Sequence, residues 1–273
     1  NPDEFQPPKE EAVRQAWGGK AEFLCSCLSY AVGLGNVWRF PYMMGQHGGS
    51  AFLLIYVLFM ITLAAPALSA EWSLGRAVRG GPLLALRTAL GPRLGPALAA
   101  LFLFAAFMAT CYYSVVVAQV LSSAWFAATN GFSEQTLAAY RGVLGEPGRQ
   151  FAWALALLAA CLWVVRRGLR GGIEVVNRLL LPLFGLASIY LVAVSLSLEG
   201  APGRLLAYLA PDFSAAGPSV WFAAMGQACF SVGLSGTLGV MYGAYLADRA
   251  PIAGTATATC AVDLGAAILA SGF

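Results

Sequence analysis

Two short runs of glycine, serine and asparagine interrupt apolar stretches of this chain. The first is Gly33-Leu-Gly-Asn36, and the second is Ser231-Val-Gly-Leu-Ser-Gly236. An unpaired backbone group costs several kcal/mol in hydrocarbon, so irregular backbone survives at that depth only where it lines a cavity. There, freed carbonyl groups suit a hard cation and freed N–H groups suit a carboxylate. Two interrupted spans in one membrane protein therefore indicate the binding site of a secondary transporter.

Two charged side chains also lie inside apolar stretches. Arg39 follows the first run, and Asp263 is the only acid of residues 255–273. Placing a charge at membrane depth is costly, so we expect both residues to serve the function. Each residue has an alternative interpretation. Arg39 could snorkel to the outer interface, and Asp263 could face a cytoplasmic vestibule.

The composition shows which elements must position these residues. The 273 residues are 59% hydrophobic and 11% charged, with a mean hydropathy of +0.71. Soluble domains carry about 25% charged residues, so the chain is predicted to be an integral membrane protein. A span needs about 20 mainly apolar residues. The predicted spans lie near 18–46, 50–76, 96–128, 151–166, 174–197, 217–247 and 255–273.

Lysine and arginine fix the predicted orientation. Positive residues gather before the first span, after the second and after the fourth, and the positive-inside rule then places the amino terminus in the cytoplasm. We expect a multi-pass protein of the cell (plasma) membrane. The net charge of +3 reflects these loops and implies no nucleic-acid partner. The residues concerned are Lys9, Arg14, Lys20, Arg76, Arg79, Arg87, Arg93, Arg166, Arg167 and Arg170.

Two further segments have a predicted role. Residues 82–90 carry apolar residues at helical spacing and one arginine, which is typical of a short interfacial helix. Residues 129–149 are polar and are expected to form an external loop. The six cysteines all fall in apolar spans and are interpreted as small packing residues.

Four runs of residues together resemble a known family. In order and spacing they resemble the helix signatures of the neurotransmitter:sodium symporter family, in particular its bacterial amino-acid transporters. The similarity covers nearly the whole chain. The runs are Gly33-Leu-Gly-Asn-Val-Trp-Arg-Phe-Pro41, Gly48-Gly-Ser-Ala-Phe52, Glu71-Trp-Ser-Leu-Gly-Arg76, and Gly226-Gln227 with Phe230-Ser231.

The resemblance implies an all-α, LeuT-type inverted-repeat fold, with about seven transmembrane helices present and helices 1 and 6 discontinuous. Residues 1–14 would be a cytoplasmic tail, 15–197 the first five-helix repeat and 198–273 the start of the second. The family has eleven or twelve helices, so we expect the single transporter domain to be incomplete. Its partners would then include carboxy-terminal helices of the same protein and the lipid bilayer. A naturally shortened version is the alternative.

The resemblance also implies sodium (Na+) as the coupling ion, with two sites that could hold it. The first site would use the carbonyl of Ala31, the side chains of Asn36 and Asp263, and the hydroxyl of Ser231. The second would use the carbonyls of Ser29 and Val32, with further ligands on a later helix. Many members carry an amide where Asp263 stands. Its charge would replace the chloride that animal relatives hold near the positions of Tyr56, Gln227 and Ser231.

The same resemblance implies an amino-acid pocket. The N–H groups of Leu34 and Gly35, with the hydroxyl of Tyr113, would hold the substrate carboxylate. Phe230 would cover the substrate as an aromatic lid, whereas Tyr112 is interpreted as a packing residue. Core packing is the alternative for Tyr113 and Phe230. The substrate amino group would meet carbonyls of Ala31, Phe230, Ser231 and Gly233.

Small residues indicate the substrate class. Gly33 stands where monoamine transporters have an aspartate, so the ligand is expected to bring its own carboxylate. Ala109 and Gly236 match positions where bulkier side chains narrow the pocket in relatives with smaller substrates. This pattern favours a large hydrophobic or aromatic amino acid.

Gating residues follow from the resemblance as well. Arg39 would form the outer gate, and Arg14 with Trp17 the inner gate. A basic amphipathic flank before the first span is the alternative for the latter pair. Glu71 is expected to hydrogen-bond the backbone near the first break. A glycine and a proline at the spacing of Gly172 and Pro182 are tied in the family to unwinding of the fifth helix, although both residues are also common in ordinary membrane helices.

The predicted function is therefore sodium-coupled symport of a hydrophobic or aromatic amino acid by alternating access. The alternative is a substrate-binding or sensing membrane protein of the same fold that does not transport. An enzyme is not expected. The chain has one histidine and shows no metal motif, no Ser/His/Asp set and no carboxylate pair.

Overall fold

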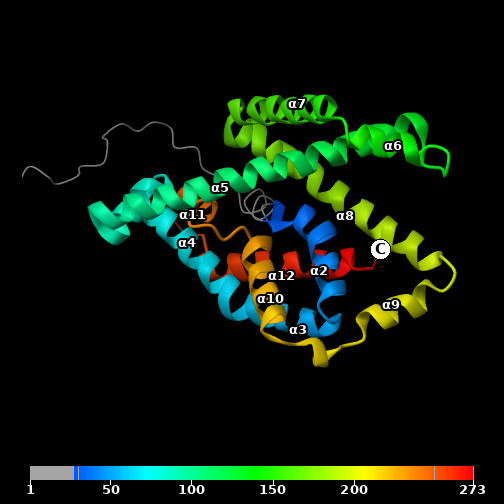
Figure 1. The fold of residues 1–273 in the computed structure, drawn as a ribbon. Coiled ribbons are helices and arrows are strands. Elements are labelled where there is room, and N and C mark those ends of the chain that lie inside the picture. The colour runs from blue at the N-terminus through cyan, green and yellow to red at the C-terminus, as the bar shows by residue number, and fades with distance from the viewer. Residues whose placement is uncertain (1–27, 30, 249, 273) are drawn as a thin grey trace, which may run out of the picture.

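Prolines and glycines divide the apolar stretches of this chain into helices of very different length. The structure is a computed structural model that describes residues 28–29, 31–248 and 250–272. All regular secondary structure in these residues is helical, which confirms the predicted all-α class (Figure 1). The α-helices are α2 (Phe40–Gln46), α3 (Ser50–Phe59), α4 (Ala65–Val78), α5 (Pro82–Asn130), α6 (Leu137–Leu144), α7 (Pro147–Arg166), α8 (Glu174–Ser197), α9 (Ala201–Leu209), α10 (Pro218–Ser231), α11 (Leu238–Ala244) and α12 (Ile252–Ala270). Four short helical turns join them, namely η1 (Gly35–Arg39), η2 (Met60–Ala64), η3 (Leu169–Ile173) and η4 (Phe213–Ala215).

Five helical segments of the described residues are long and apolar enough to cross a membrane. They are Ser50–Val78, Pro82–Asn130, Pro147–Arg166, Gly171–Ser197 and Ile252–Ala270, and they match the second, third, fourth, fifth and seventh predicted spans. The first and sixth predicted spans contain shorter pieces, η1 with α2 and α10 with α11. The segment predicted as an external loop, 129–149, connects two of these spans and contains the short helix α6.

A kink at Gly91 divides α5. Its φ of 85° and ψ of 176° lie outside the helical region, and Pro92 and Pro96 follow directly. The residues before the kink correspond to the segment predicted as an interfacial helix. The residues after it form the long rod that crosses the upper part of Figure 1. The kink therefore separates the two elements that the sequence predicts there.

Prolines explain two of the three π-helical turns. The turn η1 ends two residues before Pro41, and η2 ends two residues before Pro66. Proline has no N–H and crowds the carbonyl four residues earlier, which disfavours the α-helical pattern. The backbone instead forms wider i→i+5 bonds, from Phe40 N–H to the Gly35 carbonyl and from Ala65 N–H to the Met60 carbonyl.

The third π-helical turn, η3, follows Gly168, whose φ is 75°. Gly172 lies within η3, and a Cβ there would stand 2.1 Å from the carbonyl oxygen of Val164. Pro182 lies inside the continuous helix α8. The unwinding associated with this Gly–Pro pair is therefore not seen here, because α8 is helical from Glu174 onward.

The buried core lies among α2, α3, α4, α10 and α12. Its largest fully buried side chains include Trp72, Tyr56 and Phe40, and the rings of Phe40 and Tyr56 lie 4.9 Å apart. Helices α5, α7 and α8 instead leave most of their apolar side chains exposed. The described part of the chain thus has one packed side and one broad apolar side.

Glycine brings α4 and α11 into backbone contact. A Cβ on Gly75 would lie 2.0 Å from the carbonyl oxygen of Val240, and one on Gly243 would lie 2.3 Å from that of Trp72. Small residues permit this approach between membrane helices. The guanidinium of Arg79 also donates to the carbonyls of Ala244, at 3.1 Å, and of Leu246. These contacts attach the second piece of the sixth span to α4.

Helix α9 is held onto α2. The hydroxyl of Tyr208 donates to the carbonyl of Pro41 at 2.8 Å and also interacts with Ser271. Burial raises the pKa of Tyr208, so the hydroxyl keeps its proton at neutral pH and serves as a donor. Gly49 passes close to the backbone of the same helix, since a Cβ there would meet the Tyr208 carbonyl at 2.6 Å.

Candidate functional site

The first break in helical structure lies at Val32 and Gly33. The N–H of Gly33 is not left unpaired, because it donates to the Oδ1 atom of Asn36 at 2.9 Å. Asn36 is fully buried within η1. One polar side chain thus satisfies the backbone at the interruption and remains in the interior.

The second break comprises residues 232–237, between α10 and α11. Gly233 and Gly236 have φ values of 62° and 66°, a region that side chains disfavour. The Oε1 atom of Glu71 accepts hydrogen bonds from the N–H groups of Ser235, at 3.2 Å, and Gly236, at 2.7 Å. The expectation that Glu71 serves the first break is therefore wrong, because the close packing of α4 on α11 brings it to the second.

A buried polar cluster joins the two breaks. The Oδ1 atom of Asp263 accepts hydrogen bonds from Asn36 Nδ2 and from Ser231 Oγ, both at 2.7 Å. Its Oδ2 atom accepts one from the hydroxyl of Tyr56 at 2.8 Å. Asn36 Nδ2 also donates to the Asp263 carbonyl at 3.1 Å. All four residues are buried, and they come from η1, α3, α10 and α12.

The cluster has the chemistry of a site for a hard cation. Carboxylate, amide, hydroxyl and carbonyl oxygens are the ligands that such ions prefer. The structure thus brings together three of the predicted sodium ligands, Asn36, Ser231 and Asp263. The amide oxygen of Asn36 faces Gly33, so binding an ion through it would require the amide to turn over. Ala31 and Ser29 lie beside the same break, and the Ser29 Oγ is buried with no hydrogen bond among the described residues.

A second group of side chains lines a cavity next to η1. Its volume is about 410 Å3, and it lies between η1, α2, α5 and α10. The rings of Tyr113 and Phe230 stand 6.2 Å apart on its wall. The Tyr113 hydroxyl interacts with the backbone of Gly35. The lining residues are Leu34, Gly35, Trp38, Arg39, Tyr42, Met43, Tyr112, Tyr113 and Phe230.

Arg39 is tied to α10 rather than directed to solvent. Its guanidinium donates to Oε1 of Gln227 and stands 4.8 Å from the centre of the Phe230 ring. Gln227 is fully buried. Tyr112, interpreted from the sequence as a packing residue, is 61% exposed and lines the same cavity, so that interpretation is wrong. Its position directly before Tyr113 was the available signal.

Two predicted pocket residues lie elsewhere. Ala109 is exposed on α5 and is not among the residues that line this cavity. The space expected beside Gly236 is filled, because a Cβ there would stand 2.7 Å from Cδ2 of Phe102. Phe102 was not predicted, although it lies two helical turns before Ala109 on the same face. Arg14 and Trp17 fall outside the described residues.

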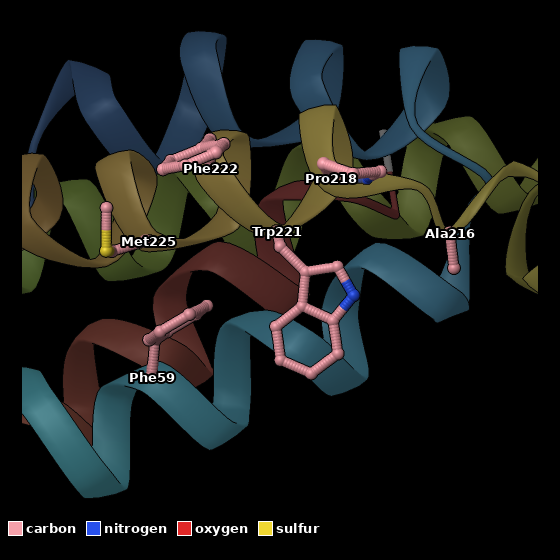
Figure 2. A pocket seen from close by; sticks show the side chains of 6 residues that line it. All are labelled: Phe59, Ala216, Pro218, Trp221, Phe222 and Met225. Carbon is pink, nitrogen blue, oxygen red and sulfur yellow. The ribbon is translucent and has the colours of Figure 1, made fainter.

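A different cavity on the outside of α10 does not share this chemistry. It has a volume of about 400 Å3 and is lined by Phe59, Ala216, Pro218, Trp221, Phe222 and Met225. Figure 2 shows the Trp221 ring beside Phe59, and their centroids lie 6.0 Å apart in an edge-to-face arrangement. None of its six side chains is ionisable, so it offers no partner for a charged ligand.

Comparison with known proteins extends these observations. A family model described as the sodium:neurotransmitter symporter family matches residues 14–139 and 127–273. The sodium-dependent transporter YhdH of Bacillus subtilis is 32% identical over 259 residues, which cover 93% of this chain and 57% of YhdH. The human inactive sodium-dependent neutral amino acid transporter B(0)AT3 is 30% identical, over 86% of this chain and 42% of its own length.

A solved structure agrees in fold. The crystal structure of MhsT in complex with L-phenylalanine superposes with a TM-score of 0.87 at 30% identity. The match covers 95% of this chain and 60% of the MhsT chain. The predicted LeuT-type class is thereby confirmed. The chain spans about half the length of the relatives named above.

Proposed function

Because the chain belongs to the sodium:neurotransmitter symporter family, we propose that it carries the ion and substrate sites of a sodium-coupled amino-acid symporter. Sodium entry would supply the energy, and the two ligands together would stabilise a closed state by differential contacts. The observation that carries this proposal is the buried cluster of Asn36, Ser231 and Asp263 at the two breaks. A buried carboxylate with converging oxygen groups favours a cation.

The proposed first sodium site uses the Ala31 carbonyl with the side chains of Asn36, Ser231 and Asp263. The proposed second site uses the carbonyls of Ser29 and Val32. Arg39 serves as the outer gate, and its contacts with Gln227 and Phe230 link that gate to α10. The proposed inner gate is Arg14 with Trp17.

The proposed substrate is a hydrophobic or aromatic amino acid. Its carboxylate would meet the N–H groups of Leu34 and Gly35 with the Tyr113 hydroxyl, at the beginning of a half-helix. A Cβ on Gly33 would meet nothing within 4 Å, so this position supplies room but no charge. Its amino group would meet the carbonyls of Ala31, Phe230, Ser231 and Gly233. The L-phenylalanine bound to MhsT supports this class.

Sodium-dependent binding tests the proposal. Purified full-length protein should bind labelled L-phenylalanine in a scintillation proximity assay only when sodium is present. Asn36→Leu should raise the sodium concentration at half-saturation by about tenfold or more, a loss of about 1.4 kcal/mol. The control is Asn130→Leu, at an exposed residue at the end of α5. An unchanged sodium affinity in Asn36→Leu would exclude Asn36 as a ligand.

Competition tests the substrate class. Tryptophan, tyrosine and leucine should displace labelled phenylalanine more strongly than alanine and glycine do, because a larger apolar side chain loses more contact with water on binding. If alanine and glycine compete best, the proposed pocket is wrong. Stronger competition by the larger side chains would place the ligand in the proposed class.

A binding protein of the same fold that does not transport is the second candidate. This candidate is supported by the human relative B(0)AT3, which is described as an inactive transporter. Vesicles loaded without sodium and placed in sodium medium distinguish the two. A symporter accumulates labelled phenylalanine above the external concentration, and collapsing the sodium gradient releases it. A binding protein retains only an amount equal to its number of sites.

We also propose that the protein lies in the plasma membrane, with its amino terminus in the cytoplasm. The arginines within 76–93 and 166–170 support that orientation. A single cysteine at Arg87 or at Glu134, in a background without other cysteines, tests it. A membrane-impermeant maleimide added to whole cells should label the cysteine at 134 and not the one at 87.

A further inference from the structure

A cavity of about 360 Å3 lies where two membrane-spanning helices end. The spanning part of α8 ends at Ser197 and that of α12 ends at Ala270, and residues next to both ends line the cavity. The beginning of α9 and Pro41 of α2 complete its wall. In Figure 1, α8 and α9 form a bend at the right of the molecule, and α2 and the end of α12 lie inside it. A cavity of this volume is within the range of small-molecule sites.

Arg204 of α9 is the charged side chain among the residues that line this cavity. Its Nη2 atom donates to the carbonyl of Glu199 at 2.8 Å. No carboxylate of the described residues forms an ion pair with it, because the two ion pairs found there are those of Arg79 and Arg149. A guanidinium has five N–H donors in a planar fork that matches carboxylate and phosphate groups. Most of these donors therefore remain available for an anion.

Two hydroxyl groups of the cavity already have backbone acceptors. The hydroxyl of Tyr208 donates to the carbonyl of Pro41 at 2.8 Å, and Oγ of Ser271 donates to the carbonyl of Ala267 at 2.9 Å. These bonds hold the surrounding helices in place. They leave Arg204 as the strongest polar group that can select a ligand. Its position also favours an anion, because Ala201 at the positive end of the α9 dipole lines the same cavity.

Much of the remaining wall is apolar. Leu196, Leu198 and Leu205 line it, and the first two are 39% and 58% exposed. A ligand that covers these leucines with an alkyl chain removes apolar surface from water. One positive charge beside an apolar wall, at the level where helices leave the membrane, matches a molecule with an anionic head and an apolar chain.

We propose that this cavity binds an anionic amphiphile, whose carboxylate or phosphate headgroup pairs with Arg204 and whose alkyl chain covers Leu198 and Leu205. A free fatty acid and an anionic membrane lipid share this chemistry. None of the lining residues belongs to the proposed sodium or substrate sites, so the inference does not rest on the proposed function. The two regions are neighbours, however, because α2 contributes Pro41 to this cavity and Tyr42 with Met43 to the cavity beside η1.

Octanoate tests the site in the full-length protein, embedded in phosphatidylcholine nanodiscs. Saturating octanoate should raise the unfolding midpoint by about 3 °C, because a ligand that binds only the folded protein stabilises it. Octanol and octyltrimethylammonium carry the same chain without the negative charge, and we expect less than about a third of that shift from either. Equal shifts with all three compounds would indicate unspecific insertion into the bilayer and would overturn the proposal.

Variants of the cavity test the role of its charge. Arg204→Gln should weaken octanoate binding by about tenfold, and Arg204→Lys should weaken it less, because lysine keeps the charge but not the fork. Leu198→Asp should also weaken binding, because it places a like charge beside the ligand. Arg141→Gln, at an exposed arginine of α6, is the matched control. If Arg204→Gln does not fold, Leu198→Asp alone decides. An unchanged octanoate affinity in either folded variant would overturn the proposal.

Photolabelling tests the location. A fatty acid with a diazirine in its chain should label the peptide that contains residues 195–208, and excess octanoate should prevent this labelling. Labelling confined to other peptides would overturn the proposal. That result would also follow if another part of the full-length chain filled the cavity.

The lipid composition of the nanodiscs distinguishes the two sources of the ligand. If a membrane lipid is the occupant, replacing half of the phosphatidylcholine with phosphatidylglycerol should weaken octanoate binding more in the wild type than in Arg204→Gln. An equal effect in both proteins would identify a free fatty acid as the ligand. Either result supports the headgroup chemistry. All of these measurements stay possible in a protein that binds no amino acid, so failure of the proposed function and failure of this inference are separate outcomes.

Discussion

The carboxylate of Asp263 receives hydrogen bonds from three helical elements besides its own. Tyr56 of α3, Ser231 of α10 and Asn36 of η1 all donate to it. Such a set of donors would otherwise suit a free anion. An ionised Asp263 would provide that negative charge within the protein, next to the groups proposed to hold sodium.

Chloride should therefore be unnecessary for uptake. Replacing chloride with gluconate should leave wild-type uptake in proteoliposomes unchanged. Asp263→Asn should weaken sodium binding by about tenfold or more, since it removes the charge next to the cation. Chloride should restore part of that loss. Glu134→Gln, at an exposed acid, is the control. Wild-type uptake that stops in gluconate would contradict this prediction.

Sequence reasoning located the polar residues of the site better than the aromatic ones. Asn36, Ser231 and Asp263 stand out because each is polar within an apolar span, where water cannot compensate an unpaired group. Phe102 and Tyr112 do not stand out, because aromatic residues in membrane helices are common. Whether the amide nitrogen or the amide oxygen of Asn36 faces Asp263 also depends on the backbone of Gly33, which no residue pattern specifies.

At the scale of helical elements, the contact of α4 with α11 depends on glycine. Gly75→Ala should lower stability by about 3 kcal/mol or more, because its Cβ would stand 2.0 Å from a backbone oxygen that cannot rotate away. Gly254→Ala on α12 is the matched control, since a Cβ there meets nothing within 4 Å. We expect it to be neutral or slightly stabilising. Equal unfolding midpoints for the two variants would refute the contact.

Arg79 terminates α4 in the left-handed conformation, with a φ of 52°. Its guanidinium binds the end of α11 through carbonyls and also pairs with Asp248, whose side chain is 89% exposed. Exposed ion pairs contribute little. Asp248→Asn should therefore change stability by less than about 0.5 kcal/mol, whereas Arg79→Ala should cost about 1–3 kcal/mol through the lost carbonyl contacts. The reverse order in thermal unfolding would show that the ion pair dominates.

The bounds of the second and seventh spans were predicted closely, because the membrane sets the length of a span. The second span was expected at 50–76 and is found at Ser50–Val78, and the seventh was expected at 255–273 and is found at Ile252–Ala270. The π-helical turns were not foreseen, although Pro41 and Pro66 are visible in the sequence. A proline shows that the hydrogen-bond pattern must change, but not which wider turn replaces it.

For the whole molecule, Tyr208 connects three parts that lie far apart in the chain. Tyr208→Phe removes the donor to the Pro41 carbonyl, so amide hydrogen exchange in α9 should become faster, with a stability loss of about 1 kcal/mol. Tyr190→Phe, at an exposed residue of α8, is the control. Unchanged exchange in α9 would mean that other contacts hold this helix on α2.

The arrangement of the helices could not be predicted in full. Apolar periodicity is weak in membrane helices, because lipid-facing and buried residues are equally apolar. The glycines of α4 and α11 are recognisable as contact residues only when their partner is known. The exposed apolar sides of α5, α7 and α8 show the same ambiguity, since residue type alone does not distinguish a lipid contact from a helix contact.

The wide turn η2 has a consequence for how this span has diverged among homologues. A π-helical turn is equivalent to a one-residue insertion into an α-helix, and each residue turns the helix by about 100°. Tyr56 before η2 reaches Asp263, and Glu71 after it reaches Gly236. A homologue that lacks one residue within 60–64 would keep both contacts with a regular helix. Substitutions alone, without that deletion, could not straighten this span and preserve them. Insertions and deletions here should therefore be single residues. A one-residue alignment gap at η2 would mark a homologue in which a regular α-helix keeps Tyr56 and Glu71 in the same relative orientation.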